Sequence, residues 1–332
     1  MTGRVAHLHS GRPMRWGIVG TGRMAGTMAE ELRGLAGAGA LLVAVCSRDA
    51  SRGRDFAARH GIVRYHASVE ALAADAEVDA VYVASPPAAH ATQCITLLEQ
   101  GKGVLCEKPF AIDEREARQV IGVARARGVF LMEALWTRFL PAVVALRDLI
   151  ASGRIGTPQL LVSGGAFVPG SDAPGYLFNP ALGGGVLHDA GVYLVSLAAY
   201  LLGEPTRVIG SASFGPSGVD ETDALVCEHG PEAKSLLYVS LRARRAPDLE
   251  LLCTGGRVLL GAPVFRPTRL TVIETGCEPA VIDYPIDGSG YGYQVRAMMA
   301  AMRRGETEST AMPLAGTLAV ARAMDACAPT RP

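Results

Sequence analysis

The sequence has no excess of charge of either sign and no pairing pattern among its cysteines. Its 332 residues include 32 basic and 32 acidic side chains, which gives a formal net charge of zero at pH 7. This balance argues against nucleic acid or an anionic membrane as a partner, because both attract basic proteins. The seven cysteines form no CxxC pair, so we predict neither a disulfide framework nor a metal site. We expect them to be reduced core residues.

Long apolar runs are also missing. No uninterrupted apolar run reaches membrane-spanning length, and Met1–Pro13 lacks the apolar segment of a signal peptide. We therefore expect a cytoplasmic protein with no membrane partner, in which Met1–Pro13 forms a loose arm. The chain is longer than a usual single hydrophobic core, so its length predicts two domains.

Lysine is scarce, which draws attention to where it is used. The chain has three lysines (Lys102, Lys108 and Lys234) among 32 basic residues, leaving 32 − 3 = 29 arginines. Lys108 follows the short apolar strand Val104–Cys106, which must stop at Pro109 because proline cannot donate to a sheet ladder. Such a strand end lies at the carboxyl edge of an open sheet, where ligands bind. Lys108 is therefore a candidate functional cation, and a surface turn lysine is the alternative.

A glycine-rich turn follows the first predicted strand, Arg15–Val19. The sequence then reads Gly20-Thr21-Gly22-Arg23-Met24-Ala25 and continues as a helical pattern. This GxGxxA motif in a strand–turn–helix context predicts dinucleotide binding, with the pyrophosphate on the helix N-terminus. We expect Gly20 to permit the turn, Gly22 to allow close approach of the phosphates, and Ala25 to let the helix pack on the strand. Arg23 and Met24 are predicted cofactor contacts.

The next predicted strand, Ala40–Cys46, ends in Ser47 and Arg48. NAD-specific sites place a carboxylate at this strand end for the ribose hydroxyls, whereas an arginine accommodates a 2′-phosphate. We therefore predict NADP in preference to NAD, with Ser47 and Arg48 at the phosphate. Asp49 can simply cap the helix that starts near Ala50.

Further strand–helix units complete the first domain, which we predict over residues 14–136. After the strand Val78–Ala84, the double proline at Pro86 is a stiff loop that can border a nicotinamide ring, and His90 begins a helix. His90 is a candidate cofactor contact, with a structural role as the alternative. The repeated βα units predict an N-terminal Rossmann domain, a doubly wound parallel sheet.

The pattern changes after Trp136. Residues 137–332 contain a helix near Pro141–Ser152 and then short alternating strands separated by Gly and Pro. This predicts a C-terminal α+β domain with a large, open, mostly antiparallel sheet, and we expect the last helix to pack back on the first domain. One helical stretch interrupts the strands: three glycines at 183–185 precede Asp189 and Tyr193, which lie four residues apart on one helical face. These two are candidate site residues, and a core tyrosine bonded to Asp189 is the alternative.

Four motifs, in this order and spacing, resemble the Gfo/Idh/MocA family of nicotinamide-dependent oxidoreductases: GTGRMA, CEKP, MEALWTRFLPA and GGGVLHDAGVY. Met132–Ala142 and Tyr193 are similar to the branch of dihydrodiol dehydrogenases and glucose–fructose oxidoreductase. The resemblance implies that Lys108 and Tyr193 are the catalytic pair. It further implies that Glu107 lies near the nicotinamide ribose, that Asp189 orients the substrate, and that the open sheet forms a homodimer or a dimer of dimers.

The chemistry of hydride transfer is consistent with these roles. A free tyrosine has a pKa near about 10, and a neighbouring ammonium lowers it toward the range of an efficient base. We therefore expect an NADP-dependent interconversion of a carbonyl and a secondary alcohol on a sugar, a sugar derivative or a cyclic diol. The alternatives are an NAD-dependent glycosidase of the same family and a non-catalytic NADP-binding regulator.

Three positions depart from the branch pattern. Tyr176–Pro180 replaces a stretch that usually carries an arginine, His188 replaces an apolar residue, and Pro87 stands where many relatives have asparagine. The first two lie where the substrate pocket is expected, although His188 can equally face solvent. The predicted pocket residues, which can also be core residues, are Trp136, Arg138, Phe167, Tyr176 and His188.

Overall fold

The computed structural model describes residues 12–171 and 173–327, so residues 1–11 of the expected arm lie outside the described residues. The chain divides into two compact units. The first unit comprises residues 12–134 and 291–317, and the second comprises residues 135–290 and 318–327. The long helix α9 (Leu314–Cys327) contributes to both.

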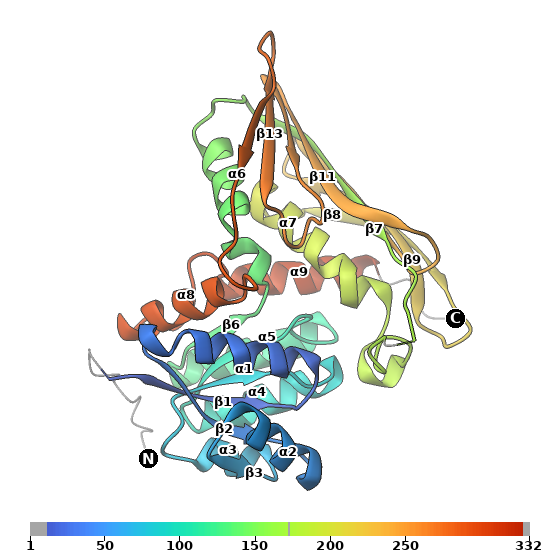
Figure 1. The fold of residues 1–332 in the computed structure, drawn as a ribbon. Helices are drawn as coiled ribbons and strands as arrows, with labels where there is room; N and C mark the ends of the chain where they lie inside the picture. The colour runs from blue at the N-terminus through green and yellow to red at the C-terminus, as the bar shows by residue number, and fades with distance from the viewer. Residues whose placement is uncertain (1–11, 172, 328–332) are drawn as a thin grey trace. The chain divides into compact units, whose positions relative to one another are not determined.

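The first unit contains a six-stranded parallel sheet in the order β3-β2-β1-β4-β5-β6 (Figure 1). Its strands are β1 (Met14–Val19), β2 (Ala40–Cys46), β3 (Arg64–His66), β4 (Ala80–Val83), β5 (Gly103–Cys106) and β6 (Leu131–Glu133). Its helices are α1 (Arg23–Gly34), α2 (Ala50–His60), α3 (Val69–Ala74), α4 (His90–Glu99), α5 (Glu114–Arg127) and α8 (Gly292–Arg303). This strand order confirms the predicted Rossmann sheet.

The second unit contains an eight-stranded sheet in the order β14-β13-β12-β11-β7-β10-β9-β8. The strands are β7 (Pro158–Ala166), β8 (Arg207–Phe214), β9 (Asp220–His229), β10 (Ala233–Ser240), β11 (Arg245–Cys253), β12 (Gly256–Leu260), β13 (Arg269–Glu274) and β14 (Ala280–Asp283). Neighbouring strands are antiparallel except for β7 and β10, which run parallel. The predicted mostly antiparallel sheet is confirmed.

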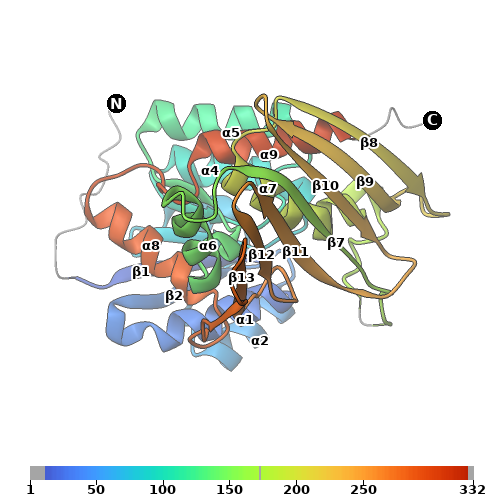
Figure 2. The same cartoon turned by 90° about the horizontal axis from the view of Figure 1, so that it is seen from above.

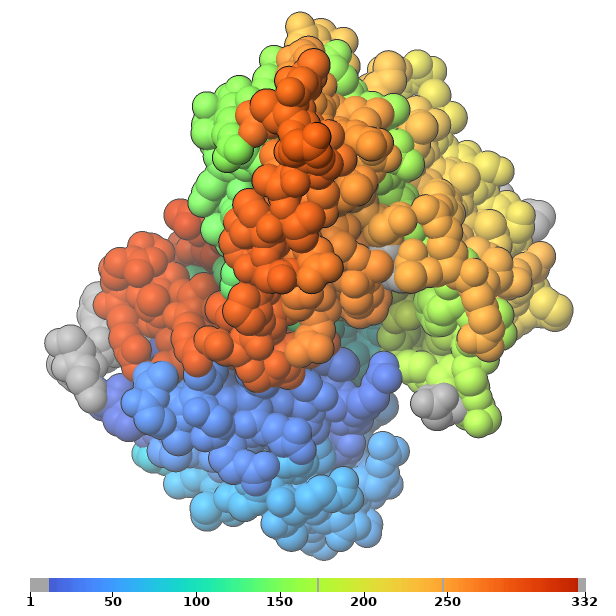
Figure 3. Space-filling view, turned by 45° about the horizontal axis from the view of Figure 1, so that its top comes forward, coloured from blue at the N-terminus to red at the C-terminus, as the bar shows by residue number. Residues whose placement is uncertain are grey.

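Two helices, α6 (Pro141–Ala151) and α7 (Val192–Leu202), pack on one face of this sheet (Figures 1 and 2). In Figure 3, residues of this unit coloured yellow and orange form much of the visible surface. One row of paired residues crosses the whole sheet from Ile209 through Val226, Leu236, Val162, Glu250, Leu259 and Thr271 to Val281. Ile209, Val226, Leu236, Leu259 and Val281 are all exposed. This row of the open face therefore presents five exposed apolar side chains.

The stretch Pro180–Leu202, which includes α7, is long and apolar enough to cross a membrane by length and composition. The sequence predicts no membrane-spanning segment, because His188 and Asp189 interrupt the apolar run. The helical stretch continues through these two residues and is therefore longer than the run. Of its most apolar window, 61% is buried inside the protein, which identifies it as a core helix covering the sheet.

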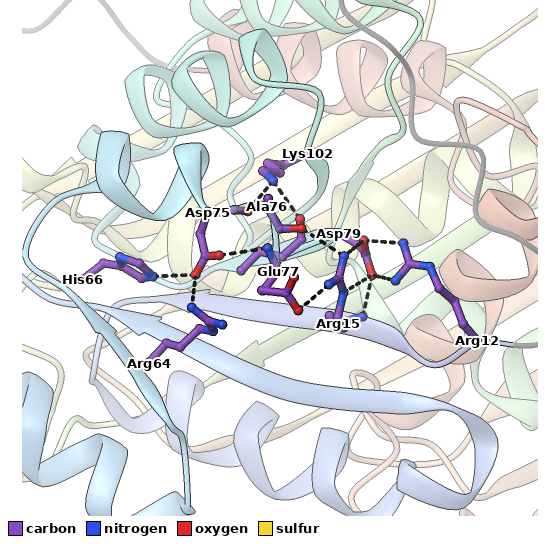
Figure 4. A network of polar contacts seen from close by, with 10 residues as sticks. Arg12, Arg15, Arg64, His66, Asp75, Ala76, Glu77, Asp79 and Lys102 are labelled. Carbon is purple, nitrogen blue, oxygen red and sulfur yellow. Dashed lines mark hydrogen bonds and ion pairs between the residues drawn. The ribbon is translucent and has the colours of Figure 1, made fainter.

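The amino edge of the parallel sheet is held by a polar network (Figure 4). Arg12 donates two hydrogen bonds of 2.8 Å to the Asp79 carboxylate, which also accepts from Arg15. Burial raises the pKa of Asp79, but the hydrogen bonds from Arg12 and Arg15 outweigh it and leave that pKa below its usual value. Lys102, just before β5, donates to the Asp75 and Val78 carbonyls at 2.6 and 2.8 Å. This lysine therefore has a structural role.

Candidate active site

The glycine-rich turn of the first unit lies at the point where the strand order reverses, between β1 and β4. Gly20 has a positive φ of 103°, and a Cβ added there would lie 2.7 Å from the Ala84 carbonyl oxygen. Only glycine fits this turn, because both the conformation and the close approach exclude a side chain. The turn thus brings the ends of β1 and β4 together at the crevice where open α/β sheets bind ligands.

Helix α1 begins in a way that fits a dinucleotide pyrophosphate. Its N-cap is Gly22, which supplies no capping side chain, and its first turn carries no acidic residue. Apart from the residues adjacent to Gly22, no atom of the described residues lies within 4 Å of a Cβ added there, so these residues leave room beside the helix N-terminus. The first-turn N–H groups and the helix dipole favour an anion there. Arg23 is exposed and Ala25 is fully buried, with Met24 between them half-buried.

The carboxyl end of β2 is followed by an arginine and by an acid that caps the next helix. Asp49 accepts a hydrogen bond from the backbone N–H of Arg52 at 3.0 Å and is the N-cap of α2, as its position in the sequence indicated. Arg48 is exposed. The Ser47 carbonyl accepts from the Tyr65 hydroxyl at 3.0 Å, which fixes the turn at this strand end.

The loop after β4 is tied to the start of α4. Pro86 precedes a single helical turn (η2, Pro87–Ala89), and His90 is the first residue of α4. His90 is completely buried, and its two ring nitrogens lie 2.8 Å from the Ser85 carbonyl oxygen and 2.9 Å from that of Pro109. Burial lowers the pKa of His90, and the charge of Lys108 adds to this effect. A cofactor contact by His90 stays a prediction.

Lys108 is the second residue after β5 and is half-buried. Its backbone N–H donates to the Glu107 carboxylate at 3.1 Å, and the Tyr82 hydroxyl on β4 also donates to that carboxylate. Glu107 is 6% exposed, so this acid is buried at the end of β5. Sequence reasoning missed Tyr82, because a tyrosine in a fully buried strand carries no signal of a polar partner.

In the second unit, the three glycines form the turn that begins the site helix. Gly185 has a φ of +118°, and an added Cβ would lie 2.0 Å from Asp220 Oδ1, so no side chain fits. Asp220 also accepts from the backbone N–H of Leu187 at 2.7 Å. A π-helical turn (Leu187–Gly191) then leads into α7, a feature that the regular helical pattern did not predict. Such turns are frequent at functional sites.

The two candidate residues on this helix are each held by an aromatic side chain. Asp189 accepts a hydrogen bond from the Tyr176 hydroxyl at 2.7 Å, and the Tyr193 hydroxyl accepts from Trp136 Nε1 at 3.2 Å. The Tyr193 ring also lies 5.9 Å from the ring of Phe265, which sequence reasoning missed because it sits in a loop without a motif. Tyr193 and Asp189 are partly exposed on a helix whose other residues are mostly buried.

The other predicted pocket residues have different surroundings. Arg138 is 2% exposed, and its guanidinium donates to the Ser196 hydroxyl and carbonyl oxygens on α7. His188 Nδ1 lies 3.2 Å from the Gly183 carbonyl oxygen, and Phe167 is exposed. Their substrate contacts stay predictions. Among the described residues, no cluster of His, Cys, Asp or Glu has the arrangement of a metal site.

The acid that supports the glycine turn has a second acid beside it. Asp223 on β9 is 1% exposed. Burial, together with a hydrogen bond to Asp220 and the charge of that residue, raises the pKa of Asp223 to about 8. A carboxyl with a higher pKa in the folded state binds more protons when folded, so its contribution to stability is lost as the pH rises toward 8.

We therefore expect the stability of Asp223→Asn to differ from that of the wild type only as the pH rises. Near pH 4 the two proteins should be similarly stable, and the variant should gain by at most about 1.4 kcal/mol per pH unit until about pH 8. Urea unfolding midpoints measured at intervals from pH 4 to 9 test this. Parallel stability curves for the two proteins would contradict it.

Comparison with known proteins places this geometry in a family. Residues 14–135 match the model of an oxidoreductase family with an NAD-binding Rossmann fold, and residues 143–259 match the Gfo/Idh/MocA C-terminal domain. The human trans-1,2-dihydrobenzene-1,2-diol dehydrogenase is 32% identical over 308 residues, covering 91% of this chain and 92% of that protein. An NADP-dependent D-xylose 1-dehydrogenase of Hypocrea jecorina is 31% identical over 360 residues, covering 95% and 92%.

Solved structures share the fold. A levoglucosan dehydrogenase in complex with NADH and levoglucosan superposes with a TM-score of 0.86 at 20% identity, covering 95% of this chain and 96% of that one. With both domain models matched in order, the family resemblance inferred from the four motifs is confirmed. The chain belongs to the Gfo/Idh/MocA family of nicotinamide-dependent oxidoreductases.

Proposed function

We propose that this oxidoreductase uses NADP to interconvert a carbonyl and a secondary alcohol on a sugar, a sugar derivative or a cyclic diol. The observation that carries the proposal is the placement of Lys108. Of the three lysines, Lys102 caps carbonyls at the amino edge of the sheet and Lys234 pairs with Glu228 at the surface. Lys108 alone follows a strand at the carboxyl edge, beside the strand-order reversal.

Each residue has a proposed task. Tyr193 is the general acid in reduction and the general base in oxidation, since its phenol is partly exposed, its hydroxyl accepts from Trp136 and its ring lies beside Phe265. Lys108 donates to the substrate oxygen as negative charge develops there and favours the phenolate form of Tyr193. Asp189, fixed by Tyr176, orients a substrate hydroxyl. The nicotinamide, when bound, donates or accepts the hydride.

The substrate class follows from the relatives and from these groups. One relative is named for a cyclic dihydrodiol and another for xylose, and both substrates carry neighbouring hydroxyls on a ring. The carboxylate of Asp189 and the phenol of Tyr193 can engage two such hydroxyls. The exposed Phe265 ring supplies apolar surface beside Tyr193.

An assay of the purified protein tests the proposal. Ring-shaped sugars, sugar lactones and trans-dihydrodiols are supplied with NADP or NADPH, and nicotinamide absorbance is followed. We expect turnover with at least one of these classes. Release of free sugar from a glycoside without net absorbance change would instead support the glycosidase alternative. Absence of turnover across the panel would contradict the proposed substrate class.

The cofactor preference gives a prediction of its own. Arg48→Asp removes a cation and supplies a carboxylate for ribose hydroxyls, so preference should change from NADP to NAD. A hydrogen bond to a charged group contributes about 1.5–3 kcal/mol, so kcat/KM for NADP should fall by about 10- to 100-fold. The control is Arg59→Asp, an exposed arginine in the last turn of α2, the helix that follows Arg48. Equal effects of the two variants would contradict the assignment.

We also propose that the protein is a cytoplasmic homodimer or dimer of dimers assembled through the open sheet. The five exposed apolar side chains in the row from Ile209 to Val281 support this, because exposed apolar patches mark interaction sites. A monomeric mass in solution would rule out this assembly, and cell fractionation tests the compartment.

A further inference from the structure

The backbone of Lys108 and of the two residues after it is held by buried ionisable side chains. Three consecutive residues each have one backbone group in such a contact. The Lys108 N–H donates to Glu107 at 3.1 Å, the Pro109 carbonyl oxygen lies 2.9 Å from His90 Nδ1, and the Phe110 N–H donates to Glu133 Oε1 at 3.2 Å. His90 and Glu133 are 0% and 1% exposed.

These contacts join elements that are distant in sequence. His90 is the first residue of α4, and Glu133 is the last residue of β6, where it pairs with Cys106 at the end of β5. The second ring nitrogen of His90 faces the Ser85 carbonyl oxygen at 2.8 Å, and Ser85 is also bonded through its hydroxyl to Gln93 on α4. The segment after β5 is therefore anchored to α4, to β6 and to the loop after β4.

Burying ionisable side chains such as His90 and Glu133 costs free energy that their hydrogen bonds must offset. Removing an imidazole or a carboxylate from water is unfavourable unless its hydrogen bonds are made, and an apolar side chain would fill the same space without that penalty. The lowered pKa of His90 indicates a neutral ring, which has a single N–H although both nitrogens face carbonyl oxygens. The single N–H can donate to only one of the two carbonyl oxygens at a time, and the tautomer with the proton on Nδ1 is the one that holds the Pro109 carbonyl.

We propose that His90 and Glu133 are positioning residues that clamp the Pro109–Phe110 backbone and thereby fix where Lys108 presents its ammonium. The inference rests on the proposed role of Lys108. It assigns a task to Glu133, which lies in the MEALWTRFLPA motif, and a task to His90 that requires no contact with cofactor or substrate. A backbone displacement here moves the lysine with it, and a misplacement of about 1 Å can lower a rate by about 100-fold.

The test uses variants that remove or retain each hydrogen bond. His90→Phe and Glu133→Met remove the contacts, and we expect each to lower kcat by about 10- to 100-fold while KM for NADP changes little. Glu133→Gln keeps an oxygen that can accept from the Phe110 N–H and should recover most of the rate. His90→Gln keeps one donor and should recover part of it.

The matched control is His229→Phe in the second unit. His229 is also buried, at 4% exposure, and its ring nitrogens contact the Gly203 carbonyl oxygen and the Ser235 hydroxyl at 2.7 and 2.9 Å. Its loss should lower the thermal midpoint about as much as the loss of His90 but leave kcat within about twofold of wild type. If lower stability were the only cause of the rate loss, His90→Phe and His229→Phe would lose the same fraction of kcat.

Equal kcat values for His90→Phe and His229→Phe would overturn the proposal, as would equal rates for Glu133→Met and Glu133→Gln. If His90→Phe does not fold, the comparison of Glu133→Met with Glu133→Gln decides. Lys108→Met distinguishes failure of the clamp proposal from failure of the proposed function. An inactive Lys108→Met with wild-type rates in the clamp variants removes the clamp alone, whereas an active Lys108→Met removes the proposed function on which it rests.

Discussion

Tyr193→Phe is expected to lower kcat by about 10²- to 10⁴-fold while KM for NADP changes little, because a positioned general acid–base group typically supplies that much of the rate. The variant keeps the ring and its packing 5.9 Å from Phe265, and loses only the hydroxyl that accepts from Trp136. The fold should therefore survive, and the loss should be confined to the step in which a proton moves to or from the substrate oxygen. Steady-state kinetics in both directions measure it.

Tyr200→Phe is the control for this change. Tyr200 lies on the same helix, about two turns further along, and its hydroxyl accepts from Arg147 at 2.7 Å. Removing that hydroxyl should leave kcat within about twofold of wild type. If Tyr193→Phe turns over as fast as Tyr200→Phe, Tyr193 is not the acid–base residue. A comparable thermal midpoint for the two variants shows that the rates are compared between folded proteins.

Lys108→Met is expected to lower kcat by about 10²- to 10³-fold, the usual effect of removing a preorganised donor to a developing oxyanion. A second effect is specific to the proposed pairing with Tyr193. An ammonium favours the phenolate, so its loss should move the rise of the oxidation rate to higher pH. The measurement is kcat for alcohol oxidation between pH 6 and 10.

The control for the loss of a lysine charge is Lys234→Met. Lys234 is an exposed residue of β10 that lies 3.4 Å from Glu228, an ion pair of the kind that contributes little to stability. Its pH profile should superpose on that of the wild type. If Lys108→Met lowers kcat but leaves the pH profile unchanged, Lys108 acts on the substrate oxyanion. The proposed effect of Lys108 on the Tyr193 phenol would then be wrong.

The elements that sequence reasoning recovered are those with a strong local pattern. Strand β2 was predicted with its observed bounds, Ala40–Cys46, and Asp49 caps the following helix as proposed. The short strands β3 and β14 were missed. Three or four residues, exposed or partly exposed, show no clear alternation, and their pairing depends on neighbouring strands.

Polar partners inside the protein were equally invisible. Tyr82 and Glu133 lie in apolar strands, where a single polar residue does not form a pattern that predicts its partner. In the structure Tyr82 donates to Glu107, and Glu133 accepts from the Phe110 N–H. The π-helical turn at Leu187–Gly191 also escaped prediction. It arises where Asp220, distant in sequence, accepts from the Leu187 N–H and presses against Gly185.

The sequence by itself determined the parallel Rossmann sheet, the open mostly antiparallel sheet and the family, because each rests on local periodicity or on contiguous motifs. Only the tertiary structure decided which side chains surround each candidate residue: Trp136 at Tyr193, Tyr176 at Asp189, and Glu133 with His90 around the Lys108 backbone. These contacts join residues 13 to 57 positions apart, and their geometry is set by strand pairing and helix packing rather than by neighbouring letters.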